Sequence, residues 1–470
     1  MIDKVKIEYT LWQVMDVLRG KYAFGESVDC GLKLLLFKRL SDQSRMEKRT
    51  QFSVPREARW SVIEGEGHNL ADKLSEALTA IEKVNYQLEG VFTNSEINFW
   101  NRFDDETLRH IIKLISELDI SDENFDDLSE LGKASEELIE KRASIEGYRR
   151  RIYTPQQVTK VMVELMNPQQ EKSIYDPVCG SGEFLAESVK FIKKLGGNLS
   201  QLNLYGQDAD SQECATTKIN LTLHGIYNFD IRVGNAISEP CFLEEGKPRV
   251  FDIVLANPPF NIKYQSELLK KINYPKRFDY GIPRNGVGNY LFIQHILSSL
   301  GDKGKAAVIL PRGVLSREGD EGQIRKSIIE ADLIEAVIEI APKLFDNVSI
   351  PVVIIIFNRS KSHKNQILFI DASCEYEAGR GKNFLHPEHI DHIVCTYRSL
   401  KDKDGFARLT HLEEIAENKY NLSVNRYVTP PADEKIDIPS EVSNLHRLEA
   451  ERSELERKID GYLQALGIKL

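Results

Sequence analysis

The spacing of hydrophobic residues changes near residue 150, and this change divides the chain. Before it, apolar residues recur every three or four positions, as along one face of an amphipathic helix. This spacing predicts helices over residues 11–18, 32–40 and 108–118. The acidic stretch 104–146 fits a solvated helical surface. Residues 1–150 are therefore expected to form an N-terminal helical domain.

Beyond residue 150, short apolar runs alternate with helical segments. Strands are expected at 173–175, 202–206, 230–233, 251–256, 305–310, 334–340, 352–357 and 367–370, with helices at 183–194, 215–224 and 323–331. The alternation predicts an α/β fold in which helices cover both faces of a parallel sheet. A run of arginines at 149–151 marks the boundary, so this second domain is expected to span 151–430.

Residues 431–470 carry a third pattern. Their apolar positions alternate between three- and four-residue spacing, which is the pattern of a helix with one apolar seam. The seam consists of Leu445, Leu448, Leu455, Ile459, Tyr462 and Leu466, with Arg452 at one further position. It predicts a helical tail that docks on a partner, and packing against its own protein is the alternative.

Composition limits the classes of function. The chain has 470 residues and a net charge of −10, which argues against binding nucleic acid over its whole surface but allows a local basic groove. No apolar run is long enough to cross a bilayer, and the first residues lead into no signal-peptide core. The six cysteines are scattered, as expected of reduced thiols. We therefore expect a cytoplasmic protein with no membrane segment.

The sequence Asn257-Pro258-Pro259-Phe260 follows directly on the expected strand 251–256. Two prolines stop the strand and stiffen the chain where an α/β sheet places its ligand crevice. The Asn257 side chain and the Pro258 carbonyl offer acceptors for an amine hydrogen, and Phe260 offers a flat face for a ring. This combination suits the exocyclic amino group of a base taken out of its stack. A proline-rich strand end with a core Phe is the alternative.

A glycine-rich turn follows the first expected strand of the α/β region. In Asp176-Pro177-Val178-Cys179-Gly180-Ser181-Gly182 the glycines let a ligand approach the backbone just before a helix begins. The turn has no Gly-Lys-Ser/Thr ending of a phosphate loop. Asp176 also disfavours a polyphosphate, and it suits a ligand that carries an ammonium or a sulfonium.

Two more polar residues close neighbouring strands. Asp208 is suited to accept hydrogen bonds from the vicinal hydroxyls of a ribose, or to cap the following helix. Asn235, in Gly234-Asn235-Ala236, is suited to pair with an adenine edge or to hold a turn. The functional roles predict a nucleoside ligand, and the structural alternatives stay open for both residues.

Taken in order, five motifs resemble the gamma class of adenine-N6 DNA methyltransferases. They are Tyr153-Thr154-Pro155, the turn 176–182, Gly206-Gln207-Asp208, Gly234-Asn235-Ala236 and Asn257-Pro258-Pro259-Phe260. Segments 34–42, 289–297 and 308–315 resemble the modification (M) subunits of type I restriction–modification systems. The resemblance spans nearly the whole chain. It implies a Rossmann-like class I methyltransferase sheet and S-adenosyl-L-methionine as the cofactor.

The resemblance also implies roles for single residues. The residues that would bind the cofactor are Tyr153, Thr154, Pro155, Asp176, Gly180, Ser181 and Gly182, with Asp208 at the ribose and Asn235 at the adenine. The residues that would act on the target are Asn257, Pro258, Pro259 and Phe260, with the Phe260 ring stacked on a flipped adenine. The chain departs from the usual pattern at Asp208, where Glu is commoner, and at Glu183, where Gly is.

The resemblance implies double-stranded DNA as substrate and several protein partners. No stretch resembles a separate target-recognition domain, so a specificity (S) subunit would choose the site, beside a second M subunit and a restriction/translocase (R) subunit. One alternative is a non-catalytic scaffold subunit of another defence complex. A protein-glutamine methyltransferase is a further alternative, which the large helical domain disfavours.

Three further groups of residues have two interpretations each. His386, His389 and His392 have a spacing that could suggest a metal, but methyl transfer needs none and we expect no metal site. Arg149–Arg151 could contact phosphate or end a helix. Basic and aromatic residues interleave after Phe260, which predicts a DNA-facing loop or an ordinary surface loop. They are Lys270, Lys271, Lys276, Arg277 and Arg284, with Tyr264, Tyr274, Phe278 and Tyr280.

Overall fold

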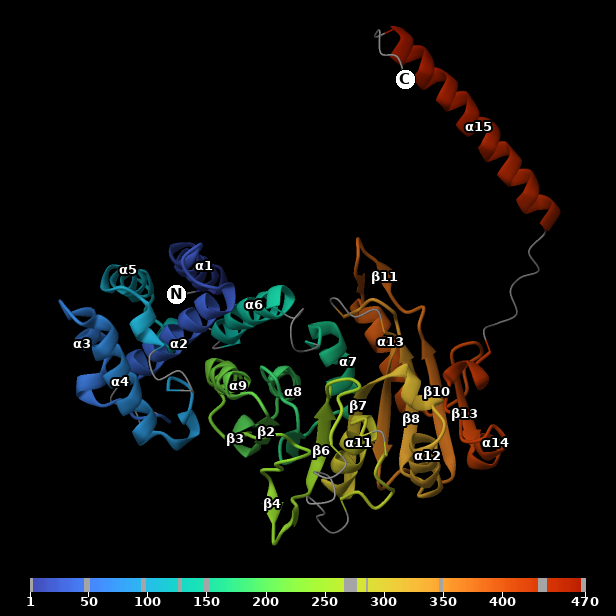
Figure 1. Ribbon diagram of the computed structural model, residues 1–470, viewed down its shortest axis with the longest axis horizontal. Coiled ribbons are helices and arrows are strands. Elements are labelled where there is room, and N and C mark those ends of the chain that lie inside the picture. The colour runs from blue at the N-terminus through green and yellow to red at the C-terminus, as the bar shows by residue number, and fades with distance from the viewer. Residues whose placement is uncertain are drawn as a thin grey trace.

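The computed structural model describes residues 3–45, 51–93, 99–125, 129–146, 153–265, 277–284, 286–345, 350–429 and 438–465. A helical domain at the N-terminus packs beside a nine-stranded sheet, and a long C-terminal helix lies apart from both (Figure 1). The predicted combination of a helical N-terminal domain with an α/β sheet is therefore confirmed.

The helical domain is built from helices that pack around its own core, with α2 buried on nearly all sides. They are α1 (Lys4–Leu18), α2 (Phe24–Gln43), α3 (Trp60–Glu64), α4 (Leu70–Val84), α5 (Asp105–Ser116) and α6 (Ser129–Glu146). The Asp3 and Asp104 side chains cap α1 and α5, accepting from the backbone N–H groups of Lys6 and Thr107 at 2.9 and 2.7 Å.

Helix α2 lies at the centre of this domain and buries its cationic residues. Lys33 is 1% exposed and lies over the Phe99 ring, 4.3 Å from the centroid. Lys38 pairs with Asp42, and Arg39 donates to the Ile120 carbonyl at 2.5 Å. Pairing offsets the cost of burying these charges, so a charged helix can serve as the core of the domain.

The nine strands follow the order β13-β10-β8-β9-β7-β6-β1-β2-β3. They are β1 (Ser173–Asp176), β2 (Asn203–Asp208), β3 (Phe229–Val233), β6 (Phe251–Ala256), β7 (Leu300–Pro311), β8 (Ile334–Ile340), β9 (Val352–Asn358), β10 (Gln366–Ala372) and β13 (Ala407–His411). The two-stranded ribbons are β4–β5 (Leu243–Glu244, Lys247–Pro248) and β11–β12 (Glu377–Ala378, Asn383–Phe384).

Helices cover both faces of the sheet, as the sequence predicts. One apolar core contains residues of α7 (Gln156–Met166), α8 (Glu183–Lys194) and α13 (Pro387–Ser399), and the opposite core contains residues of α11 (Asn289–Ser298), α12 (Asp320–Glu330) and α14 (Leu412–Glu417). Helix α9 (Ser211–Leu223) contributes Leu221 to the sheet's core and Ile219 to that of the helical domain. It therefore joins the two domains.

The expectation of a wholly parallel sheet is wrong for two strands. Strand β9 pairs antiparallel with β7 and β8, and β13 pairs antiparallel with β10. Only residues 341–351 separate β8 from β9. A crossover between parallel strands takes a dozen or more residues and usually a helix, so this short connection returns the chain antiparallel. The strands β1, β2, β3, β6 and β7 pair parallel, so their carboxyl ends share one edge.

The C-terminal helix is α15 (Ile438–Ala465). The seam residues that can be described, Leu445, Leu448, Leu455 and Ile459, are each more than half exposed. Leu466 lies outside the described residues. None of the helices in the described ranges is long and apolar enough to cross a membrane.

Candidate methyltransferase site

The glycine-rich turn after β1 adopts a conformation that needs its glycines. Gly180 and Gly182 have φ angles of +52° and +86°, in the left-handed region that side chains disfavour. A Cβ atom at Gly182 would lie 2.9 Å from Cγ2 of Thr217. Helix α9 therefore lies directly against the turn at Gly182.

Two side chains of α9 hold the turn in place. The Thr217 hydroxyl donates to the Gly180 carbonyl at 2.6 Å, and the Asn220 side-chain amide donates to the Ser181 carbonyl at 3.1 Å. Both residues are at least 98% buried. Sequence reasoning missed them, although a helix with Thr216, Thr217, Asn220 and Thr222 beside a glycine turn carries a signal. Buried polar side chains need partners, and the turn supplies them.

Asp208 at the end of β2 fixes the same turn from the opposite side. Its carboxylate accepts from the Gly180 N–H at 3.1 Å and from the Asp210 N–H at 2.9 Å. Asp210 is the residue that caps α9, by accepting from the Gln212 N–H at 2.9 Å. The alternative of Asp208 as the helix cap is therefore wrong, and Asp208 lies directly against the predicted cofactor turn.

The electrostatics of the turn are acidic. Burial raises the pKa of Asp176 well above its ordinary value, and the nearby carboxyls of Glu183 and Asp208 raise it further. Burial also raises the pKa of Glu183 to about 7, although its side chain accepts from the Ser181 hydroxyl. A ligand that brings an ammonium and a sulfonium would compensate these carboxyls. The residues present therefore fit S-adenosylmethionine.

Asn235 holds a turn and contacts Tyr264. Its Oδ1 accepts from the backbone N–H groups of Ile237 and Ser238 at 2.9 and 3.1 Å. Its Nδ2 lies 3.3 Å from the hydroxyl of Tyr264, the first aromatic residue of the segment after Phe260. Asn235 therefore holds a turn, as one of its two interpretations predicts. Tyr264, which was expected in a DNA-facing or surface loop, lies beside Asn235.

The structure brings Thr154 and Asn257 together, although 102 residues separate them in the sequence. The Asn257 side-chain amide donates to the Thr154 hydroxyl at 2.9 Å. Thr154 is 5% exposed, and Pro155 after it precedes α7. Tyr153 instead packs against the core of the helical domain. The motif at 153–155 therefore joins that domain to the end of β6.

A clamp holds the segment that follows Asn257. Asn261, with a φ of +54°, donates its backbone N–H to Oδ1 of Asn289 and accepts from Nδ2 of Asn289, both at 3.1 Å. Arg317 also donates to Asn261 Oδ1 at 3.1 Å. Pro258 is buried, while Phe260 is partly buried against the main core. The clamp residues were not predicted from the sequence.

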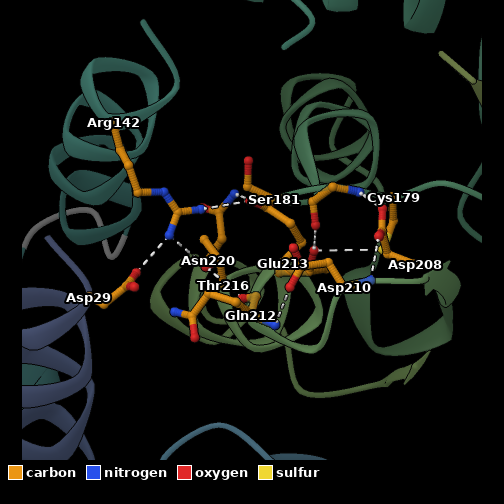
Figure 2. A network of polar contacts seen from close by, with 12 residues as sticks. Asp29, Arg142, Cys179, Ser181, Asp208, Asp210, Gln212, Glu213, Thr216 and Asn220 are labelled. Carbon is orange, nitrogen blue, oxygen red and sulfur yellow. Dashed lines mark hydrogen bonds and ion pairs between the residues drawn. The ribbon is translucent and has the colours of Figure 1, made fainter. Parts of the chain in front are cut away.

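A buried ion network ties the helical domain to the cofactor turn (Figure 2). Arg142 of α6 donates to Asp29 of α2 at 2.6 Å and, on α9, to Glu213 at 3.2 Å and Thr216 at 3.3 Å. Its side chain is 7% exposed. Because α9 also holds the turn through Asn220, this network connects the N-terminal domain mechanically to the site.

The basic and aromatic residues expected in a loop after Phe260 have different surroundings. Arg277 is 1% exposed and donates to the carbonyl of Ile237 at 2.9 Å, so its predicted place in a DNA-facing loop is wrong. Phe278 is also buried, whereas Arg284 is exposed, as expected of a surface loop, and pairs with Asp320. Residues 149–151, Lys270, Lys271, Tyr274 and Lys276 lie outside the described residues.

The three histidines near α13 make separate contacts. His386 pairs with Glu377, His389 accepts from the backbone N–H of His386 at 3.1 Å, and His392 pairs with Glu375 at 3.0 Å. Among the residues that the structure describes, no three His, Cys, Asp or Glu side chains gather in a way that could hold a metal ion.

The geometry of this edge defines a class of protein. Acidic groups that suit a cationic nucleoside lie at β1 and β2, and a stiff loop with acceptors for an amine lies at the neighbouring β6. This is the arrangement of a methyltransferase with the Rossmann-like class I fold.

The sequence matches the N-6 DNA Methylase family over residues 126–435 and the HsdM N-terminal domain over residues 7–116. It is 32% identical over 412 residues to the type I restriction enzyme MjaVII methylase subunit of Methanocaldococcus jannaschii, covering 84% of this chain and 70% of that protein. It is 30% identical over 454 residues to the HindI methylase subunit of Haemophilus influenzae, covering 88% of this chain and all of that one.

A solved structure is similar over most of the chain. It is the type I restriction-modification system methyltransferase subunit from Streptococcus thermophilus, with a TM-score of 0.75 and 25% identity over 91% of this chain and all of that one. The chain therefore belongs to the N-6 DNA methylase family, as a modification subunit of the type I restriction–modification kind. It is an adenine-specific DNA methyltransferase, and its methyl donor is S-adenosylmethionine.

Proposed function

We propose that this chain methylates N6 of an adenine swung out of double-stranded DNA, in the cytoplasm, with Asn257, Pro258, Pro259 and Phe260 as its catalytic residues. The cofactor residues would be those of segments 153–155, 176 and 180–182, with Asp208 and Asn235. The observation that supports this best is the 2.9 Å hydrogen bond between Asn257 and Thr154. It brings the residue predicted for the amine into contact with one predicted for the cofactor.

The chemistry asked of the protein is chiefly positioning. S-adenosylmethionine, when bound, supplies an electrophilic methyl group. Asn257 donates through Nδ2 to Thr154, so its Oδ1, at the opposite edge of the planar amide, points away from Thr154. Asn257 Oδ1 and the Pro258 carbonyl would accept the two amine hydrogens and so orient the nitrogen lone pair. Phe260 would stack on the base, offsetting part of the few kcal/mol that flipping costs.

The acidic turn has a second task in this proposal. Asp176, Glu183 and Asp208 would balance the positive charge of the donor before transfer. The developing ammonium on the target nitrogen would then be tolerated by the acceptors at Asn257 and Pro258. No strong base is needed before attack, because the amine nitrogen already carries the lone pair that forms the new bond.

We also propose that the chain works beside a specificity subunit, a second modification subunit and a restriction/translocase subunit. The division of the molecule at 150 and 430 belongs to this proposal, with 431–470 as the docking tail. The support is α15, on which Leu455 is 59% exposed and Leu445 55%. Four exposed apolar residues along one helix favour burial against a partner.

Co-expression with a specificity subunit tests both parts. The purified complex should transfer tritium from labelled S-adenosylmethionine to DNA, and an assembled complex that transfers none to any DNA would contradict the catalytic proposal. Leu455→Glu should reduce co-purification of the specificity subunit at least tenfold, since it places a charge in the apolar seam. Ser453→Glu adds the same charge off the seam and should leave co-purification unchanged. Equal recovery with both variants would contradict the docking role.

A further inference from the structure

A cavity lies on the carboxyl edge of the sheet, beyond the loop that carries Asn257. Its volume is about 620 Å³, and it opens where β7 ends and β9 begins. Backbone hydrogen bonds fix its walls. The Arg312 N–H donates to the Pro351 carbonyl at 2.8 Å, and the Leu422 N–H donates to the Leu315 carbonyl at 2.9 Å. The cavity is therefore built by the fold itself.

The side chains that line this cavity are rich in hydrogen-bond donors. The polar ones are Arg312, Ser316, Asn421, Ser423, Asn425 and Arg426. None of the described lining residues is acidic, although the chain as a whole has a net charge of −10. Two guanidinium groups therefore stand in a setting that attracts an anion.

The donors are not all committed to the protein. Arg312 pairs with Glu339 at 3.1 Å. Asn425 and Arg426, by contrast, are exposed, and their side chains make no hydrogen bond or ion pair with any part of the chain that the structure describes. An exposed guanidinium beside an amide and a hydroxyl is well suited to phosphate oxygens, which accept several hydrogen bonds at once.

A residue next to the cavity also contacts the segment that follows Asn257. Arg317, which donates to Asn261 at 3.1 Å, follows the cavity residue Ser316 directly in sequence. Strand β7 lies between β6 and β9, and neighbouring strands are about 4.8 Å apart. The cavity thus lies roughly two strand spacings, ~10 Å, along the edge from Asn257. Phosphates of one strand follow each other by about 3.4 Å along the helix axis, so ~10 Å corresponds to about three nucleotides from the base that enters the site.

We propose that this cavity, the β7–β9 groove, binds the sugar–phosphate backbone of the DNA strand whose adenine enters the site. This rests on the proposed function, since it assigns a place to that same substrate. Arg426 and Asn425 contact phosphate, and Arg312 adds charge from the groove wall. Backbone contacts of this kind set the register of the strand and carry no sequence information, which suits a chain whose target sequence is chosen by another subunit.

The test uses the full chain in complex with its specificity subunit and a labelled duplex of mixed sequence. Affinity is measured over a range of salt concentrations for wild type, Arg426→Gln, Arg426→Glu and Arg56→Gln. Arg56 is an exposed arginine of the helical domain and serves as the matched control. Losing one phosphate contact lowers the slope of log affinity against log salt by about 0.9. We expect that change for Arg426→Gln, with several-fold weaker binding at low salt.

Arg426→Glu should weaken binding further, while Arg56→Gln should match wild type, and all variants should bind S-adenosylmethionine equally. An unchanged slope and affinity for both Arg426 variants would overturn the groove. Competition by inorganic phosphate as effective as that by unlabelled duplex would also overturn it, in favour of a small-anion site. A complex that binds duplex through Arg426 and transfers no methyl group would contradict the proposed function and leave the groove standing.

Discussion

The two halves of the sheet's carboxyl edge are held in different ways. On the cofactor half, the turn 176–182 donates a hydrogen bond to Asp208 on one side and accepts hydrogen bonds from Thr217 and Asn220 on the other. On the target half, Asn257 contacts Thr154, and its loop is clamped further along at Asn261. The first half forms a complete cradle, whereas the second is a short loop tied at its two ends.

The difference fits what each half is proposed to bind. A small cationic cofactor is the same in every turnover, so a rigid cradle loses nothing and avoids the cost of ordering on binding. A base on a DNA strand has to enter and leave. We therefore expect substitutions on the cofactor half to change affinity, and those on the target half to change the rate of transfer.

The largest effect should come from Asn257→Ala. The variant loses an acceptor that would be aimed at the reacting amine, and the loss of one such preorganised group typically slows a reaction about a hundredfold to a thousandfold. Affinity for S-adenosylmethionine and duplex should stay close to wild type, as measured by calorimetry and salt titration. Asn203→Ala is the control, because Asn203 begins β2 and so lies at the amino end of the parallel strands, away from the site. Substantial turnover by Asn257→Ala would contradict the assignment of Asn257 to the transfer step.

A smaller effect is expected from Thr217→Val on the cofactor half. The substitution keeps the shape and removes the hydroxyl that donates to the Gly180 carbonyl. A neutral hydrogen bond contributes about 1 kcal/mol, which corresponds to roughly fivefold weaker binding of S-adenosylmethionine. The turnover rate at saturating cofactor should not change.

Thr222→Val provides the matched control for that measurement. Thr222 is buried on the same helix, and its hydroxyl donates to Lys218 within α9 at 2.7 Å. It should leave cofactor affinity unchanged. If both variants weaken cofactor binding equally, the cause is a less stable α9, and the contact between Thr217 and the turn does not determine cofactor affinity.

The last prediction concerns the stability of the fold, and its dependence on pH through Glu183, rather than activity. Burial raises its pKa from 4.5 to about 7. Well below pH 4.5 the carboxyl is protonated in both the folded and the unfolded chain. As pH rises from about 4.5 to about 7, the unfolded chain releases the proton while the folded chain keeps it, so the folded state loses stability; above about 7 both release it and the loss levels off. In cofactor-free protein, the gain in melting temperature of Glu183→Gln over wild type should therefore be small near pH 4.5 and full near pH 8.

Glu171→Gln removes an exposed carboxylate outside the site and is the control for that experiment. A difference in melting temperature between Glu183→Gln and wild type that does not grow with pH would show that Glu183 carries no titrating charge in this range. The acidity of the cofactor half would then rest on Asp176 and Asp208.

The sequence predicted the positions of the functional motifs because each has a local cause. The strand 251–256 was predicted with the bounds that the structure gives it, since an apolar run ended by two prolines leaves little choice. The order of the motifs predicted that they lie together on one edge of the sheet, because the carboxyl ends of parallel strands meet there. The roles of the individual site residues remain predictions.

The contacts that tie the motifs together are not local, and the sequence did not predict them. The insertion of β9 between β7 and β8 depends on pairing across the sheet. Arg277 is of a residue type that often contacts DNA, but its buried guanidinium donates to the carbonyls of residues 236 and 237. Likewise, the polar residues of α9 indicate that they have buried partners, but the sequence does not identify the Gly180 carbonyl as the partner of Thr217.

The central claim is that the carboxyl edge methylates adenine in DNA at N6. The most direct measurement incubates DNA with the chain, its specificity subunit and S-adenosylmethionine carrying a deuterated methyl group, then identifies the labelled nucleosides by mass spectrometry. The account predicts N6-methyladenine with the mass of the deuterated methyl, and its loss with Asn257→Ala. Label in cytosine or in protein glutamine, or label in adenine that persists with Asn257→Ala, would contradict it.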